Sequence, residues 1–267
     1  MPMTEPAVTA RDLVLGYGTK VALGPSSFEI PRAQVTAVIG PNGSGKSTLL
    51  HAIAGLTAPT SGTLETTGPF NGHPRIAYVL QTTKVNEALP ISVSEVVMMG
   101  RYADKGLYGW IRQEDRDAVA RALDRVGLGS SGHIHLADLS GGQRQRAFVA
   151  QGLAQDHDIL LLDEPMNGID LPAAHAIDRA IHEEVEEGCT VVMTTHDLSE
   201  ARVADFVLLL SGRVVASGPP SQVLTKDHLL EAYESAQLHI GDNEIFVDDS
   251  AHVPVAGRHV HRERSKG

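Results

Sequence analysis

The pattern of hydrophobic and polar positions first predicts β structure. Residues 8–39 alternate β-rich runs with turn residues, as in VTARDLVL, a Gly-Tyr-Gly turn and VALGPSSFEI, and they end in the apolar run QVTAVI. This order predicts a small sheet that leads into a buried strand. STLLHAIAGL follows with apolar residues at helical spacing, so residues 35–56 read as strand, loop and helix. Short strands are expected around Gly62 to Leu64 and from Arg75 to Leu80.

Further along, the pattern becomes helical and then alternates. SVSEVVMM, QEDRDAVARALDRVGL and GGQRQRAFVAQGLAQ each carry an apolar stripe, which predicts an inserted helical subdomain over about 90–155. DILLLDEP, PAAHAIDRAIHEEVEEG, CTVVMTTHD and FVLLLSGRVVASG then restore the alternation that is typical of a parallel sheet with crossover helices. We expect an α/β fold with one domain over 1–237 and a polar, His-containing, flexible tail over 238–267.

Composition narrows the class of protein. The 267 residues carry a formal net charge of −11, which argues against a nucleic-acid partner because non-specific binding needs clustered basic residues. The acidic run HEEVEEG is expected on a solvated helix face. Cys189 is the sole cysteine, so we expect no disulfide and interpret it as a small buried hydrophobe. The start MPMTEPAVTA lacks a basic, apolar leader and every apolar run is short, which predicts a cytoplasmic chain without a membrane span.

A glycine-rich loop between the predicted strand and helix points to phosphate binding. GPNGSGKS matches the pattern G-x-x-x-x-G-K-[ST] in the required strand–loop–helix context, which disfavours a chance glycine turn. Its amides form an anion cradle at a helix start, with Lys46 on the outer phosphates and Ser47 on magnesium. The predicted nucleotide-binding residues here are Gly40, Pro41, Asn42, Gly43, Ser44, Gly45, Lys46, Ser47 and Thr48.

Polar residues at the ends of other predicted strands supply catalytic candidates. Asp163, which ends an apolar strand, suits a magnesium contact, and Glu164 beside it suits polarisation of the attacking water. The Gln81 amide can meet both the magnesium and that water, and the His196 imidazole can bind the γ-phosphate. Tyr17 can stack on an adenine ring. Each alone has a structural alternative, namely a polar or aromatic residue at the end of a strand.

A second glycine element, LSGGQ, opens another predicted helix. Ser140, Gly141, Gly142 and Gln143 fit a phosphate site at a helix start. They fit a capping box equally well, with Ser140 as the cap and Gln143 three residues later. Local physics leaves both interpretations open.

Taken together, GPNGSGKST, YVLQ, LSGGQRQR, ILLLDEP, a loop through Asp170 and TTHD resemble the ATP-binding subunits of ABC transporters in order and spacing over about residues 8–235. The resemblance implies an ABC ATPase fold: a P-loop core with a mostly parallel sheet, an N-terminal antiparallel β subdomain and an inserted helical subdomain. It implies a Mg²⁺-dependent ATPase and a head-to-tail homodimer in which LSGGQ closes on the partner's ATP. It also makes Tyr17 the adenine-stacking aromatic, Gln81 the coupling glutamine and Asp170 a residue that communicates across the dimer. PMNGID departs from the commoner P-x-S-A-L-D, so contacts of Met166 to Ile169 across the dimer are expected to differ.

The cargo is suggested by a finer resemblance. ISVSEVVMMGRY, EPMNGID and TTHDL are similar to the metal-cation branch, the importers of zinc or manganese. That implies membrane-embedded permease subunits, an extracytoplasmic metal-binding protein, and a location on the cytoplasmic face of the membrane. An iron-chelate importer is the alternative, although Gly100-Arg-Tyr-Ala-Asp departs from its GRYPH-like stretch. A soluble non-transport ABC ATPase and a small-molecule kinase are further alternatives, and LSGGQ has no role in the kinase.

The tail adds a weaker metal signal. His259 and His261 form an H-x-H pair whose imidazoles suit zinc, with His239 and His252 nearby in sequence. A ligand set is not evident, and a plain flexible end remains the alternative.

Overall fold

The computed structural model describes residues 5–68, 72–81, 90–102 and 110–233, together with the backbone of 237–240 and 245–248. Its central sheet has six strands in the order β5-β6-β7-β3-β8-β9. These strands are β5 (Ile76–Val79), β6 (Ile159–Asp163), β7 (Thr190–Thr194), β3 (Val35–Ile39), β8 (Phe206–Leu210) and β9 (Val214–Gly218). All neighbours pair in parallel except β9, which runs antiparallel to β8. The predicted, mostly parallel sheet is therefore confirmed.

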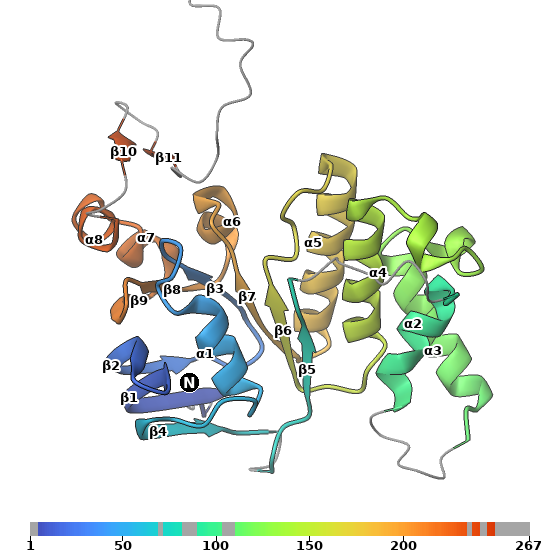
Figure 1. The fold of residues 1–267 in the computed structure, drawn as a ribbon, viewed down its shortest axis with the longest axis horizontal. Coiled ribbons are helices and arrows are strands. Elements are labelled where there is room, and N and C mark those ends of the chain that lie inside the picture. Colours follow the sequence, from blue (N-terminus) through green and yellow to red (C-terminus); the bar gives the residue numbers. More distant parts are fainter. Residues whose placement is uncertain are drawn as a thin grey trace, which may run out of the picture.

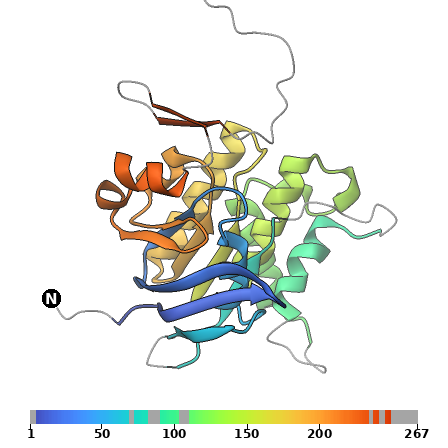
Figure 2. The same cartoon turned by 60° about the vertical axis from the view of Figure 1, so that its left-hand side comes forward.

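A second sheet lies against the first. It is antiparallel, in the order β2-β1-β4, and consists of β1 (Val8–Tyr17), β2 (Lys20–Ile30) and β4 (Ser61–Thr66). Figure 2 shows these strands along one side of the molecule. Helix α1 (Lys46–Ile53) shares one hydrophobic core with these strands and with the central sheet. The predicted N-terminal β layer is thus present.

The two faces of the central sheet serve two separate cores. Leu160 and Leu162 of β6 join the core that contains the helices α4, α5 and α6, whereas Ile159 and Leu161 join the core of α1 and the antiparallel sheet. Side chains of a strand alternate between faces, so a strand that is covered on both sides must be apolar at every position. Full burial of a leucine stabilises the fold by about 2 kcal/mol.

The helices on the face of the central sheet that α1 does not cover form two groups. Helices α5 (Leu171–Glu186) and α6 (Leu198–Val203) pack on the sheet. Helices α2 (Val93–Tyr102), α3 (Gln113–Arg125) and α4 (Gly141–Leu153), with the 3₁₀ turns η2 (Gly129–Ser131) and η3 (Leu136–Asp138), form the predicted helical region, which stands to one side in Figure 1.

Ion pairs with at least one buried member hold the helical region together and join it to the rest of the chain. Arg101 of α2 lies 3.1 Å from Asp115 of α3 and 2.9 Å from Asp156, which precedes β6. Arg125 of α3 binds Glu184 of α5 at 2.5 Å. The expectation that the whole HEEVEEG run is solvated is therefore wrong for Glu184, which is 5% exposed, because an arginine from another helix neutralises it.

The C-terminal part contains elements that the sequence analysis did not predict. Helices α7 (Pro220–Val223) and α8 (Lys226–Ala232) precede two short antiparallel strands, β10 (Gln237–Ile240) and β11 (Ile245–Asp248). The predicted tail over 238–267 thus includes β11 and most of β10, and His239 lies in β10. His252, His259 and His261 lie outside the described residues. Among the helices of the described parts, none is long and apolar enough to cross a membrane.

Candidate nucleotide-binding site

Neighbouring strands deliver the candidate residues to one edge of the sheet. β5, β6, β7 and β3 are consecutive and parallel, so their carboxyl ends share an edge. Gln81 follows β5, Asp163 ends β6 and Glu164 comes directly after it. His196 follows β7, and the glycine loop follows β3. Ligands of open α/β sheets bind at this edge.

The glycine loop has the backbone of an anion cradle. Gly40, Gly43 and Gly45 have φ angles of 149°, 78° and 102°, a region that L side chains rarely adopt. A Cβ at Gly45 would lie 2.8 Å from the carbonyl oxygen of Ala22 in β2, so this glycine is also required by a close approach. The loop then enters α1 directly, which places its amides at a helix N-terminus.

Two side chains of the loop are arranged for a phosphate. Lys46 Nζ donates to the carbonyl oxygens of Gly40 at 2.7 Å and Pro41 at 3.2 Å, and the residue is only 7% exposed. The Ser44 hydroxyl is buried and has no hydrogen-bond partner among the described residues. A buried ammonium beside an unsatisfied hydroxyl is a costly arrangement that a bound phosphate would satisfy, so the residues fit a nucleotide.

The acidic pair at the end of β6 is held by the adjacent strand. The Thr194 hydroxyl of β7 donates to Asp163 Oδ1 at 2.5 Å, and Thr194 Oγ1 accepts from the Glu164 amide at 2.9 Å. Asp163 pairs with Thr194 in the parallel register. Glu164 has a φ of 49°, which is unusual for a residue with a Cβ. The threonine therefore anchors a strained turn at this edge.

The Glu164 carboxylate is the meeting point of the site. Its Oε2 accepts from Gln81 Nε2 at 2.5 Å and from Asn167 Nδ2 at 2.8 Å, and it lies 4.0 Å from His196 Nδ1. The Glu164 side chain is 14% exposed and that of His196 is 62% exposed. The structure thus brings Gln81, Glu164 and His196 together with Asn167, which the sequence analysis did not select.

The aromatic candidate, Tyr17, contacts α1, the helix that follows the glycine loop. Tyr17 ends β1 with an exposed ring, and its Oη lies 3.2 Å from Nδ1 of His51 in α1. His51 also meets the Tyr78 ring edge-on, with ring centroids 5.6 Å apart. Burial and the charge of Asp163 raise the pKa of Tyr78, so this phenol stays neutral beside the acidic strand end.

The LSGGQ element forms a capped helix start. Ser140 Oγ accepts from the Gln143 amide at 3.2 Å, and Gln143 Oε1 accepts from the Ser140 amide at 2.9 Å. Asp170 caps α5 with a single bond, in which its carboxylate accepts from the Ala173 amide at 3.0 Å. In Figure 1, α1 and α4 lie on opposite sides of β6 and β7, so one chain does not place LSGGQ against its own glycine loop.

The residues that sequence analysis missed had weak signals. Asn167 lies in PMNGID, where only the departure from the commoner pattern pointed to it. Thr194 lies in TTHD, but its role follows from the pairing of β6 with β7, which a sequence does not display.

Comparisons with known proteins agree with this geometry. The family described as ABC transporter matches residues 23–167. The zinc transport system ATP-binding protein TroB of Treponema pallidum is 38% identical over 262 residues, covering 94% of this chain and 97% of that protein. The manganese transport system ATP-binding protein MntB of Bacillus subtilis is 37% identical over 225 residues, covering 83% and 90%. A solved metal-chelate type ABC transporter in an inward-facing conformation superposes with a TM-score of 0.75 at 25% identity, covering 91% of this chain and 96% of that one.

Proposed function

Because the chain belongs to the ABC transporter family, as an ATP-hydrolysing subunit, we propose that it powers the import of a divalent metal cation, zinc or manganese. The observation that carries the ATPase part is the Glu164 carboxylate, held by two amide donors next to Asp163 at the nucleotide edge. The proposal of zinc or manganese as the cargo rests on the sequence identity with the zinc and manganese transport proteins over most of each chain.

The glycine loop binds the phosphates. Its amides and the Ser44 hydroxyl donate to phosphate oxygens, and Lys46 turns its ammonium from the loop carbonyls to the outer phosphates. Ser47, Asp163 and Gln81 would hold Mg²⁺, which would neutralise phosphate charge when bound. Tyr17 covers the adenine ring.

Glu164 accepts the hydrogen bond of the attacking water. Gln81 and Asn167 fix the direction of the carboxylate, and His196 donates to the γ-phosphate. Phosphoryl transfer depends on positioning and on charge neutralisation, so these fixed donors are expected to be the main contribution of the side chains to catalysis.

The ATPase role is tested by Glu164→Gln, with the exposed Glu29→Gln as a matched control. The amide keeps the shape of Glu164 but accepts a proton poorly, so hydrolysis should fall by at least a hundredfold while ATP binding persists. Phosphate release and equilibrium nucleotide binding measure the two effects separately. Unimpaired hydrolysis in Glu164→Gln would remove the glutamate from this role.

Two copies of the chain form the working unit in this proposal, with Ser140 to Gln143 of one copy facing the ATP of the other and Asp170 near the contact. Ser140→Ala should abolish hydrolysis, whereas Thr225→Ala, which removes the cap of α8, should cost only stability. Equal ATPase activity in both variants would reduce LSGGQ to a helix cap and would favour a kinase-like site.

The cargo is tested in metal-starved cells that lack this chain. Zinc, manganese and iron content is measured after complementation with the wild type or with Glu164→Gln. A selective recovery of zinc or manganese with the wild type alone is expected. Recovery of iron alone would favour the chelate importer suggested by the metal-chelate type structural neighbour, and no metal effect would favour a non-transport ATPase.

The remaining partners follow from the cargo. Separate membrane-embedded permease subunits conduct the ion, an extracytoplasmic binding protein delivers it, and the chain acts at the cytoplasmic face of the membrane. Co-purification of the chain with membrane proteins after mild solubilisation tests this arrangement.

A further inference from the structure

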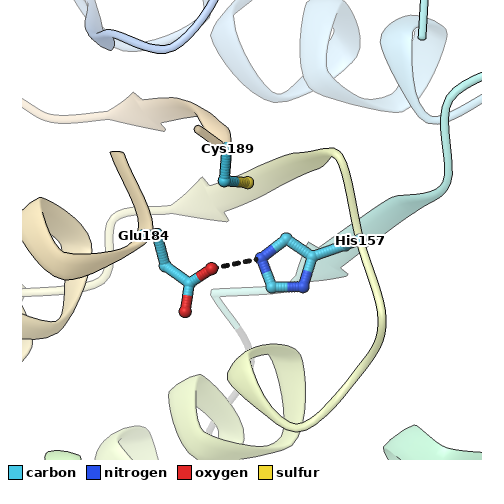
Figure 3. A group of neighbouring side chains, drawn as sticks. All are labelled: His157, Glu184 and Cys189. Carbon is cyan, nitrogen blue, oxygen red and sulfur yellow. Dashed lines mark ion pairs between the residues drawn. The ribbon is translucent and has the colours of Figure 1, made fainter. Parts of the chain in front are cut away.

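Three potential metal ligands meet at the edge of the sheet opposite the nucleotide site. Figure 3 shows His157 from the loop before β6, Glu184 from α5 and Cys189 from the residue before β7. Their ligand atoms all lie within 4.8 Å of one another. β6 has five residues, so the cluster lies about 15–20 Å from the carboxyl edge.

The histidine is oriented as a metal ligand. Its Nδ1 lies 2.9 Å from the carbonyl oxygen of Gln155, and since a carbonyl only accepts, Nδ1 carries the proton. Nε2 faces Glu184 Oε2, 3.0 Å away, and offers a lone pair to an ion once it loses its own proton. Metal-bound histidines commonly donate their other ring nitrogen to a backbone carbonyl, which fixes the ring.

The site is buried, yet His157 Nε2 has no hydrogen-bond partner among the described residues. The His157 and Glu184 side chains are 4% and 7% exposed, and Cys189 is 6% exposed. Although Nε2 and Oε2 are at ion-pair distance, their alignment does not make a hydrogen bond, so Nε2 is unsatisfied among the described residues. Burial lowers the pKa of His157, but the nearby Cys189 and Glu184 outweigh burial and raise that pKa to about 10.

The carboxylate has a separate partner for each oxygen. Glu184 Oε1 binds Arg125 at 2.5 Å, whereas Oε2 faces the histidine. A metal on Oε2 would leave the arginine contact intact, and that contact would orient the ligand. A cavity of about 310 Å³, lined by His157, Glu184 and Arg125 among others, opens beside the cluster and gives an ion and a water molecule a route to it.

We propose that His157, Glu184 and Cys189 form a zinc site, with water as the fourth ligand. Thiolate, imidazole and carboxylate are the donors that zinc accepts in four-coordinate sites, whereas manganese and magnesium prefer oxygen ligands. Binding would release the thiol proton and displace any proton on Nε2. The proposal does not depend on which cargo the transporter carries.

Cobalt absorption tests the site directly, because the chain has a single cysteine. Co²⁺ added to the metal-free full-length protein should produce a thiolate-to-cobalt charge-transfer band that saturates near one ion per chain and disappears when Zn²⁺ is added. The band can arise only from Cys189. Folded wild-type protein without a band would overturn the proposal.

Variants separate this site from the histidines of the tail. Cys189→Ala should abolish the band, and His157→Gln should weaken cobalt binding by at least tenfold. A double variant, His259→Ala with His261→Ala, should keep the band unchanged. Zn²⁺ should raise the melting temperature of the wild type but not that of Cys189→Ala. A His157→Gln variant that binds cobalt with wild-type affinity would also overturn the proposed ligand set.

Discussion

Replacing Thr194 by valine should disable catalysis without touching a nucleotide contact. The shape is preserved, but two hydrogen bonds are lost, one to the Asp163 carboxylate and one from the Glu164 amide. A bond to a charged group contributes about 1.5–3 kcal/mol and a neutral one about 0.5–1.5 kcal/mol. The expected loss in the free energy of unfolding is therefore about 2–4 kcal/mol.

The catalytic effect follows from the backbone of Glu164. Its left-handed conformation costs about 1–2 kcal/mol, which is similar to what the lost amide bond supplied. Without that bond the turn can relax, and the Glu164 carboxylate is no longer held in the direction of the attacking water. We therefore expect kcat to fall at least tenfold, which corresponds to a rise of about 1.4 kcal/mol in the activation free energy. ATP binding measured without Mg²⁺ should stay unchanged because the glycine loop is intact.

The assay is steady-state phosphate release together with urea unfolding. Thr36→Val is the matched control, since Thr36 is fully buried in β3 and its hydroxyl has no hydrogen-bond partner among the described residues. That control should be neutral or stabilising. A Thr194→Val protein with kcat within about twofold of wild type and an unchanged urea midpoint would refute the reasoning.

Three other predictions concern stability. Arg101→Leu leaves the buried Asp115 carboxylate without its arginine and should cost about 3–5 kcal/mol in urea unfolding, and adding Asp115→Asn should recover part of this loss. Gly45→Ala places a Cβ at a residue with positive φ and close to a backbone carbonyl of β2, so the melting temperature and the nucleotide affinity should both fall. An unchanged affinity would show that nucleotide binding does not depend on this loop conformation. Hydrogen bonds from Ser92 lower the pKa of Glu95 below its usual 4.5, so their stabilisation is present above pH 4.5 and lost as the pH falls through the lowered pKa. Acid unfolding of Glu95→Gln should lack that component, and an identical acid profile would contradict it.

The sequence predicted the elements of the nucleotide edge well because each is local. A strand that ends in glycines or carboxylates can be read from neighbouring residues, as in the loop before Lys46 and in Asp163. The contact between Asn167 and Glu164 could not be predicted, because it depends on a left-handed turn whose sequence departs from the common pattern.

Contacts between residues that are far apart in the sequence could not be predicted, for a different reason. The hydrophobic periodicity shows that β6 and β7 are strands but does not show that they are neighbours. The burial of Glu184 and its meeting with His157 and Cys189 depend on that neighbourhood and on the position of α3. An acidic run at helical spacing is normally solvated, so the prediction failed where an arginine from another helix reached it.

The cap at Ser140 has a consequence for the order of assembly. The hydroxyl uses a lone pair to accept the Gln143 amide, so its hydrogen stays available for an anion. Helix α4 can therefore form completely in an isolated subunit, and an arriving phosphate does not have to break the cap to be bound. In the proposed dimer, the LSGGQ element would therefore be ordered before the second copy arrives, and association would lose little free energy to ordering it.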